Sequence, residues 1–262
     1  MKVNNIKARA YGAFKTYAAH YDTKKISIAL KIAHSYRVAD ISERIAASLL
    51  SEQTAINFAW LLGLLHDIGR FEQFTRYGTF KDLLSIDHAE LGADILFCDG
   101  LIEKFFSQED WSLTQEEFFN FKRIAETAIR LHNKLKIPDD LDAQTELYTK
   151  ILRDADKLDI FRVTTEPPYE EHHKDLSGLV ARPEVMQCVM EHRCVPRSSV
   201  SANDLEILIA QCCMAFELEF PESRKIACEQ GYLMKLLEVN SKFLAIVKSE
   251  ILNVFGKDFF ES

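Results

Sequence analysis

The sequence predicts an all-α protein, and three observations support this fold class. Apolar residues recur at three- and four-residue spacing along most of the chain, which is the period of an amphipathic helix. Only nine glycines and six prolines occur in 262 residues, so few positions interrupt a helix. No stretch shows the alternation of apolar and polar residues that is typical of a strand. With 47% hydrophobic residues, the chain can bury a sizeable core.

Two helices are expected early in the chain. The first has an apolar face at helical spacing that comprises Ile26, Ala29, Ile32, Ala33, Val38, Ile41, Ile45 and Leu49. The second covers residues 55–65 and is apolar on most sides, so we expect it to lie centrally. Gly69 follows shortly afterwards and is expected to release the chain into a turn.

Three more helices are expected before residue 165. Capping boxes, in which an Asp or Thr stands three residues before a Glu, mark two helix starts at residues 87–90 and 114–117. Pro138 is expected to end the second of these helices. A long helix should follow from about residue 142 to residue 160, because its apolar residues keep the helical period.

The rest of the chain is also expected to be helical. A charged break follows Pro167-Pro168, and helical segments are expected at residues 183–191, 203–220 and 223–248, with Asn203 as an N-cap. We therefore predict a single all-α domain over residues 1–262. Its core would be formed by residues 20–165, and a C-terminal helical part, residues 166–262, would pack on that core.

Composition limits the classes of function. The net charge is -8, with 40 acidic and 32 basic side chains, so we expect no large nucleic-acid surface, because phosphate backbones are held by Lys and Arg. The N-terminus lacks the apolar stretch of a signal peptide, and no apolar run is long enough for a membrane span. A cytoplasmic protein is expected. The six cysteines form no C-x-x-C pair, so buried reduced thiols are expected, as at Cys212-Cys213.

A His-Asp pair, His66-Asp67, stands at the end of the apolar helix and is the main functional signal. Carboxylates are rarely buried unless they are paired or bind a metal. Four other residues of ligand type also stand beside positions that should be buried, namely His34, His88, His132 and Asp156. Each alone has an ordinary explanation, such as a helix end for His132 or an ion pair for Asp156. Together they can converge from several helices on one metal site.

The order of these residues resembles a known ligand set. His34, His66-Asp67 and Asp156, in the pattern H…HD…D, resemble the metal ligands of the HD superfamily of metal-dependent phosphohydrolases. The resemblance covers about residues 25–165, in the order and the helical context of that family. It implies an HD-domain-like helical bundle with a buried metal centre and, in this chain, a C-terminal helical extension.

The resemblance also implies a ligand assignment. Family members with two additional histidines often hold two metal ions, and His88 and His132 match that pattern. Asp67 would then bridge the ions, with His34, His66 and Asp156 on one ion and His88 and His132 on the other. Asp156 is preferred to Asp154 and Asp159 because it precedes a Lys-Leu pair, as the family's ligand does. Mixed His and carboxylate ligands favour one or two divalent ions of Fe, Mn, Co, Ni or Zn.

The implied reaction is cleavage of a phosphate ester or anhydride by metal-activated water. Asp67 and Arg70 are the expected catalytic residues, and Arg70 and Lys134 the expected contacts to a small phosphorylated substrate, such as a nucleotide or dinucleotide. Arg70 can equally be an ion-paired structural residue. His172-His173 can form a lid or a solvated loop. The apolar residues of the C-terminal part can cover the pocket or form a homodimer surface.

Two other functions remain open from the sequence. Di-iron oxygenases of the HD fold, which act on a polyol or a phosphonate-like substrate, show a similar H…HD…H…H…D pattern. A non-catalytic regulator that binds a nucleotide is the second alternative, although the presence of all six ligand-type residues argues against a degenerate domain. Iron content with oxygen consumption would indicate the first, and tight nucleotide binding without turnover would indicate the second.

Overall fold

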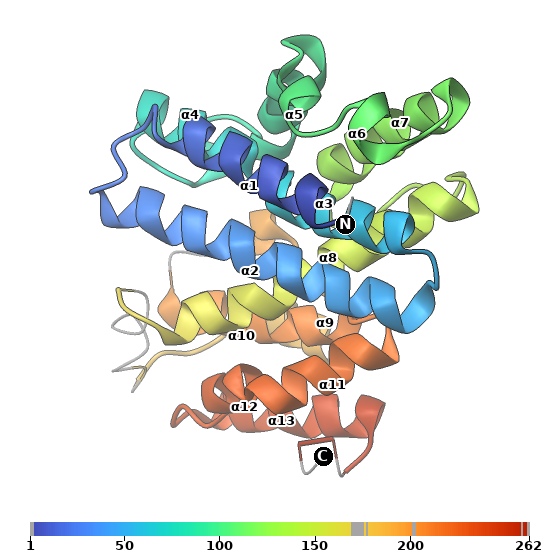
Figure 1. Cartoon of the computed structure of the whole chain (residues 1–262). Coiled ribbons are helices and arrows are strands. Elements are labelled where there is room, and N and C mark those ends of the chain that lie inside the picture. The colour runs from blue at the N-terminus through green and yellow to red at the C-terminus, as the bar shows by residue number, and fades with distance from the viewer. Residues whose placement is uncertain (1–2, 169–175, 177, 201–202, 258, 261–262) are drawn as a thin grey trace. The chain divides into compact units, whose positions relative to one another are not determined.

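The computed structural model describes residues 3–168, 176, 178–200, 203–257 and 259–260. Over this part of the chain the secondary structure is helical and contains no strand, which confirms the predicted all-α class (Figure 1). His172-His173, considered as a lid, lies outside the described residues. No described helix combines the length and the apolar character needed to cross a membrane.

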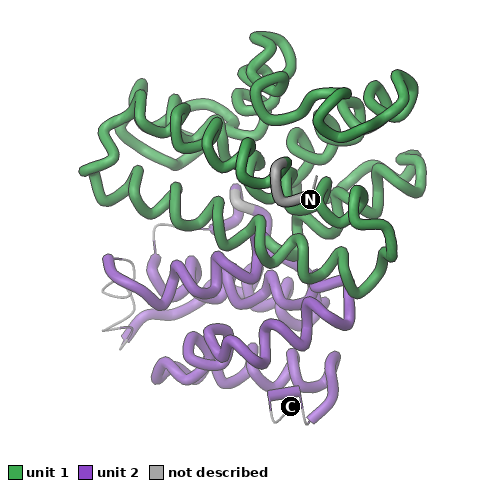
Figure 2. The backbone as a smooth tube through the Cα atoms, in the orientation of Figure 1, with its two compact units in different colours: residues 1–155 green, residues 156–262 purple. Residues whose placement is uncertain are grey.

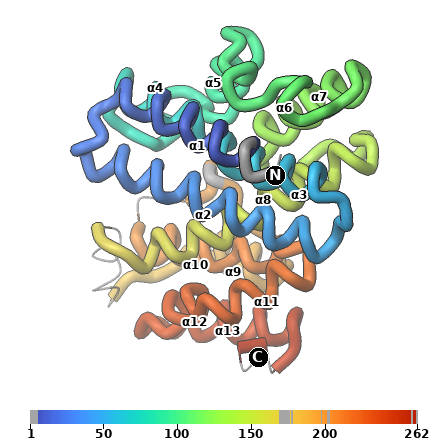
Figure 3. Tube along the Cα trace, in the orientation of Figure 1, coloured from blue at the N-terminus to red at the C-terminus, as the bar shows by residue number. Residues whose placement is uncertain are grey.

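The chain divides into two compact units, residues 1–155 and residues 156–262 (Figure 2). The boundary falls inside one continuous helix, α8 (Ala143–Thr165). Figure 3 traces the chain from its N-terminus to its C-terminus. The single domain over residues 1–262, with its core at residues 20–165, stays a prediction.

The first unit contains seven α-helices before α8 among its described residues, with three short 3-10 or π turns. They are α1 (Val3–Ala18), α2 (Ile26–Leu49), α3 (Gln53–Leu65), α4 (Ile68–Tyr77), η1 (Asp82–Leu84), α5 (His88–Ala93), η2 (Asp94–Cys98), η3 (Leu101–Lys104), α6 (Gln108–Trp111) and α7 (Gln115–Leu131). Helix α1 precedes the predicted core and contacts α3. It buries Ala10, Phe14 and Ala18, an apolar stripe of helical spacing.

Helices α2 and α3 form the centre of this unit. Every residue of α3 from Ile56 to Leu65 is buried, which confirms its predicted central place. Gly63 allows the two helices to approach closely, because a Cβ atom there would lie 2.7 Å from the Cα atom of Ala39. The contact is therefore made between backbones, and it joins the helix that carries His34 to the helix that precedes His66-Asp67.

We predicted that Gly69 would release the chain into a turn. Gly69 is instead the second residue of α4. Its role is close packing of α4 against α5. A Cβ atom at residue 69 would lie 2.3 Å from the carbonyl oxygen of His88 and 2.6 Å from the backbone nitrogen of Gly92. The missing side chain lets the start of α5 reach the start of α4.

Both predicted helix starts are capped, but only one forms a full capping box. The Thr114 hydroxyl accepts from the backbone N–H of Glu117, whose side chain accepts from the backbone N–H of Thr114. The Asp87 carboxylate accepts from the backbone of α5, as predicted. The Glu90 carboxylate instead pairs with Arg130.

Helix α7 ends at Leu131, earlier than the predicted end near Pro138. The guanidinium of Arg153 explains this early end, since it donates to the carbonyl oxygens of Leu131 and His132 at 3.1 and 3.2 Å and to that of Lys134. A buried cation from α8 thus takes over carbonyls that a longer helix would have used.

The second unit contains the last part of α8 and five further helices among its described residues. They are α9 (Pro183–Met190), α10 (Asp204–Cys213), α11 (Pro221–Gln230), α12 (Tyr232–Leu237) and α13 (Lys242–Phe255). Asn203 caps α10, as predicted. The helix expected over residues 223–248 is interrupted, because Gly231 has φ of +69° and ends α11. The α-helix expected over residues 203–220 ends earlier, at Cys213. Cys212 and Cys213 are buried free thiols, which confirms that prediction.

Candidate metal centre

Four histidines surround the carboxylate of Asp67. They come from different helices: His34 lies on α2, His66 follows the last residue of α3, His88 begins α5 and His132 follows the last residue of α7. All five side chains are buried. This group of His34, His66, Asp67, His88 and His132 is called the His–Asp cluster below.

The two oxygens of Asp67 divide the histidines into two pairs. The Nε2 atoms of His34 and His66 lie 3.5 and 3.6 Å from Oδ2. Those of His88 and His132 lie 3.3 and 3.9 Å from Oδ1. We call these the Oδ2 side and the Oδ1 side of the cluster. Each side supplies two imidazole nitrogens and one carboxylate oxygen that lie within 4.8 Å of one another.

The position of Asp67 in the chain explains why its carboxylate is available. Asp67 stands between α3 and α4 with φ of -101° and ψ of 19°, so it belongs to neither helix. An Asp at this N-cap position commonly accepts hydrogen bonds from the next turn of backbone, but the side chain of Asp67 makes no such cap. Its two oxygens face the histidines instead.

Hydrogen bonds at Nδ1 orient the imidazole rings. Nδ1 of His66 lies 2.7 Å from the carbonyl oxygen of Gly63, and Nδ1 of His132 lies 2.7 Å from that of Ile129. A carbonyl can only accept, so the proton is assigned to Nδ1 in both rings and the lone pair to Nε2. These lone pairs point into the cluster.

Facing Nε2 atoms suit a cation. The Nε2 atoms of His34 and His66 are 3.3 Å apart, and those of His88 and His132 are 3.0 Å apart. Between His88 and His132, whose Nδ1 atoms are both hydrogen-bonded, two Nε2 lone pairs at this distance repel each other, whereas a divalent ion can accept both. Neutral imidazoles with an ionised carboxylate form a donor set that suits Mn, Fe, Co, Ni or Zn. The residues present therefore fit the predicted metal centre.

Nearby cations keep Asp67 ionised. Burial alone raises the pKa of the Asp67 carboxyl, but the Lys31 ammonium, together with the Arg70 guanidinium, outweighs burial and holds the pKa well below its usual value. The Lys31 ammonium donates to Oδ2 at 2.6 Å, and Nε of Arg70 lies 3.4 Å from Oδ1. Each side of the carboxylate thus has one neighbouring side-chain cation.

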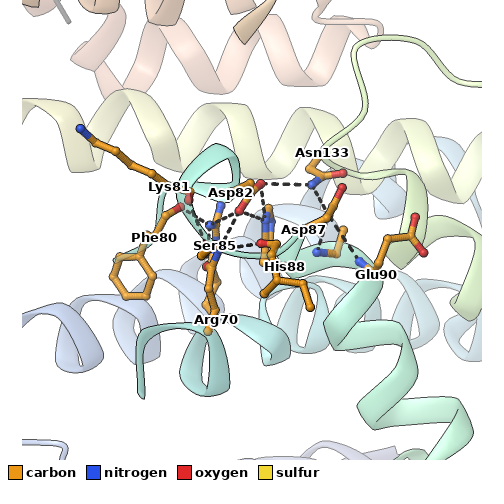
Figure 4. A network of polar contacts seen from close by, with 12 residues as sticks. Arg70, Phe80, Lys81, Asp82, Ser85, Asp87, His88, Glu90 and Asn133 are labelled. Atoms are coloured by element: carbon orange, nitrogen blue, oxygen red, sulfur yellow. Dashed lines mark hydrogen bonds and ion pairs between the residues drawn. The ribbon is translucent and has the colours of Figure 1, made fainter. Parts of the chain in front are cut away.

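His88 is held by a carboxylate from the turn before its helix. Nδ1 of His88 lies 2.9 and 2.8 Å from the two oxygens of Asp82 in η1 (Figure 4). Burial lowers the pKa of His88 to about 4, and the Arg70 charge adds to this, while Asp82 opposes it. His88 is therefore a neutral imidazole near pH 7, the form that a metal ion requires.

Arg70 lies at the cluster, as predicted, but its guanidinium is extensively bonded. Its Nη1 donates to Gln73, to Asp82 and to the carbonyl oxygen of Phe80 at 2.9, 2.9 and 2.6 Å (Figure 4). Arg70 thus forms an ion pair with Asp82, in line with the alternative of an ion-paired residue. A contact from Arg70 to substrate stays a prediction.

The Lys134 ammonium bonds with Asp87 at 2.7 Å and pairs with Glu90 at 3.0 Å. Burial lowers the pKa of Lys134, but these two carboxylates outweigh it and raise the pKa above its usual value. Lys134 remains charged, and its predicted contact to substrate stays a prediction.

Asp156 is the first residue of the second unit and lies half-buried on α8. It is three residues past Arg153, whose guanidinium binds the carbonyl oxygen of His132. The neighbouring acids Asp154 and Asp159 are both buried. The role of Asp156 as a ligand stays a prediction.

Two polar residues of the site were missed from the sequence. Lys31 precedes His34 by three residues, so helical spacing alone places both on one face of α2 and was an available signal. Asp82 lies in a segment with no expected helix, and no spacing rule connects it to His88. Only the three-dimensional path of the chain between α4 and α5 reveals its contact.

Comparison with known proteins gives one match. Residues 32–160 match the family model of the HD domain, and this range contains all six predicted ligands. No curated protein and no solved structure matches the chain.

Proposed function

This chain belongs to the HD domain family through residues 32–160, and from that premise we propose that it is a phosphohydrolase that depends on two divalent metal ions. The family is largely one of metal-dependent phosphohydrolases. The observation that carries the proposal is the division of four imidazole Nε2 atoms between the two oxygens of Asp67. A carboxylate with this arrangement can bridge two ions.

We assign the ligands by the two sides of the cluster. His34 and His66 would hold the ion on the Oδ2 side, and His88 and His132 would hold the ion on the Oδ1 side. Asp67 would be shared. Asp156 would complete the Oδ2 side, a role supported by its inclusion in the family match and by its place on the helix that binds the end of α7.

Bound ions would supply a coordinated water of lowered pKa and positive charge that offsets the charge of a phosphate group. The protein's own residues prepare this chemistry. Asp67 stays ionised through Lys31, and the Nδ1 bonds keep lone pairs on Nε2. The Asp67 carboxylate, the Lys31 ammonium and the Arg70 guanidinium also set the net charge of the site before substrate binds.

We propose a small phosphorylated substrate of the nucleotide or dinucleotide class. Lys31 is the stronger candidate for a phosphate contact, because its side chain is 22% exposed and its ammonium group stands on a flexible four-carbon stem. Arg70 is 11% exposed and already donates three bonds through Nη1. Lys134 remains a further candidate for a contact to the phosphate group.

The test is a screen for phosphate release. Protein loaded separately with Mn, Fe, Co, Ni or Zn is incubated with nucleotides, dinucleoside polyphosphates and cyclic nucleotides, and phosphate is measured. We expect release that requires metal and that disappears in Asp67→Ala. The exposed-residue variant Asp99→Ala is the matched control and should retain activity. No release with any of these metals would contradict the proposal.

A second candidate is a di-iron oxygenase that acts on a polyol or phosphonate-like substrate. The four histidines around one carboxylate favour it, since imidazole and carboxylate are also ligands of iron. Oxygen consumption by the iron-loaded protein would support this reaction. Full activity of the manganese-loaded protein without oxygen would exclude it.

A further inference from the structure

We propose that Asp82 is the positioning residue of the Oδ1 side: it orients His88 as a metal ligand, and binding of the second ion depends on it. This inference rests on the metal centre of the proposed function, and it concerns a residue of the loop between α4 and α5. Asp82 is not among the ligands assigned above.

The first support is the geometry of the pair. Both oxygens of Asp82 lie within 2.9 Å of Nδ1 of His88, and the Asp82 side chain is only 11% exposed. The Asp82 carboxylate accepts a hydrogen bond from Nδ1–H of His88. Nε2 of His88 then carries the lone pair, and it faces His132 at 3.0 Å and Asp67 at 3.3 Å.

The second support is the place of His88 on its helix. His66 and His132 follow the last turn of a helix, so each finds an acceptor at the carbonyl three residues earlier. His88 is the first residue of α5 and has no preceding helical turn to offer such a carbonyl. Its Nδ1 therefore needs an acceptor from elsewhere, and η1 provides Asp82.

The third support is the way in which α4 holds Asp82. The Gln73 amide donates to Asp82, to the Ser85 hydroxyl and to the Ile86 carbonyl, each at 2.9 Å. Arg70 donates to Asp82 and to the Phe80 carbonyl. Figure 4 shows Arg70, Phe80, Asp82 and Ser85 close together at the turn before α5. The turn is thus fixed to α4, and these bonds hold the Asp82 carboxylate beside His88.

The consequence concerns ligand strength as well as orientation. A carboxylate that accepts a hydrogen bond from one imidazole nitrogen fixes the tautomer of the ring and makes the other nitrogen a stronger metal ligand. Loss of such a carboxylate weakens metal binding by about 10- to 100-fold. Backbone carbonyls, which serve His66 and His132, are weaker acceptors than a carboxylate. The same network gives Arg70 a positioning role, because it balances the charge of Asp82.

The experiment compares Asp82→Ala, Asp82→Asn and Ser85→Ala with the wild-type chain. Bound ions per chain and their dissociation constants are measured by elemental analysis and calorimetry, and anomalous scattering locates the ions. We expect Asp82→Ala to keep the ion on the Oδ2 side and to bind the other about 10- to 100-fold more weakly. Asp82→Asn keeps an acceptor oxygen without the charge and should lose less, about tenfold at most.

A second measurement needs no metal. Nitrogen NMR of the metal-free protein reports which ring nitrogen of His88 carries the proton. We expect the Nδ1–H form in the wild-type chain and in Asp82→Asn, and a mixture with the Nε2–H form in Asp82→Ala. Ser85→Ala removes two bonds at the turn, the one from Gln73 and the one to the Lys81 carbonyl, so it should lower thermal stability slightly but keep both ions and the Nδ1–H form.

Several outcomes would overturn the inference. Unchanged affinity for both ions in Asp82→Ala, or an unchanged His88 tautomer, would show that Asp82 does not position the ring. Equal loss of the second ion in Ser85→Ala would assign the effect to the turn as a whole. A wild-type protein that binds two ions but releases no phosphate would contradict the proposed reaction alone, because the Asp82 result is read from ion binding and from the tautomer.

Discussion

The Oδ2 and Oδ1 sides of Asp67 have the same donor atoms but different surroundings. On the Oδ2 side, the Lys31 ammonium bonds directly with the shared carboxylate at 2.6 Å. On the Oδ1 side, the cation is Arg70, whose Nε is 3.4 Å from Oδ1 and whose Nη1 bonds with Asp82. A positive charge therefore opposes an incoming ion on the first side, whereas Asp82 offsets the positive charge on the second.

The two sides also differ in how the chain brings them together. The Oδ2 side joins α2 and α3, which are consecutive in sequence and touch at Gly63. The Oδ1 side needs α4, α5 and α7, the close contact at Gly69 and the turn that carries Asp82. More separate elements must be correctly placed for the second pair of histidines. We expect the Oδ1 side to be the more easily disrupted.

The largest effect should come from the residue that both sides share. Asp67→Ala removes one ligand from each ion and should abolish binding of both. Without the ions, the transition state would lose several kcal/mol of stabilisation, so kcat/KM should fall about 1000-fold or more. Elemental analysis and phosphate release measure the two effects. Retention of two ions in this variant would show that Asp67 does not bridge them.

Single histidine variants should separate the sides. His34→Ala should lose the ion on the Oδ2 side, and His88→Ala should lose the ion on the Oδ1 side. Anomalous scattering at the metal edge locates the ion that remains in each. If two ions persisted in His88→Ala, the two-ion assignment would be wrong. His20→Ala, an exposed histidine near the end of α1, is the matched control.

The two glycines should give smaller, side-specific effects. A methyl group at Gly69 would meet the backbone of α5 at 2.3 Å, and one at Gly63 would meet the backbone of α2 at 2.7 Å. We expect each Ala variant to be destabilised by about 1–3 kcal/mol, as for other overpacked cores. Thermal unfolding measures this loss. Gly69→Ala should weaken only the ion on the Oδ1 side, and Gly63→Ala only the other.

Replacement of Lys31 should act in the opposite direction. Lys31→Met removes the ammonium that competes for Oδ2 of Asp67, so metal affinity on that side should rise about tenfold, the equivalent of about 1.4 kcal/mol for a charged hydrogen bond. Calorimetric titration of the metal-free protein tests this. Lys24→Met changes an exposed lysine shortly before α2 and should leave both affinities unchanged. A decrease in affinity in Lys31→Met would refute competition by the ammonium.

The smallest effect should be at the start of the helix that leads to His132. Thr114→Ala removes the capping box of α7 and should lower stability by about 1 kcal/mol. Because His132 lies at the other end of α7, both metal affinities should stay unchanged. Thermal unfolding and calorimetry together check this separation. A changed affinity on the Oδ1 side would mean that general stability of α7, and not the local network, controls that side.

Helical periodicity was sufficient to predict the class of the fold and several helices. The stripe from Ile26 to Leu49 became α2, and the apolar run before His66 became the buried helix α3. The errors came from tertiary contacts. Gly69 looked like a turn residue, but its bare backbone serves a helix contact that depends on Gly92. Sequence spacing contains no information on such a crossing.

The candidate ligand residues stand out in the sequence because their chemistry is unusual beside apolar neighbours. His34, His66, Asp67, His88 and His132 are all buried and close together, in agreement with that expectation. Their partners were harder to find. Asp82 looks like an ordinary acid before a short turn, and its contact to His88 exists only because Gln73 and Arg70 fix that turn. Charged residues in irregular segments lack a periodicity from which their direction can be predicted.

The positions of the ligands along the chain have a further consequence for the lifetime of the fold. The His–Asp cluster gathers residues from position 34 to position 132, so ions bound there would act as removable cross-links across most of the first unit. Ligands that bind only the folded state add about 4 kcal/mol at a free concentration 1000-fold above the dissociation constant. Opening of this unit would require release of the ions. We therefore expect metal supply to govern its resistance to proteolysis as well as its chemistry.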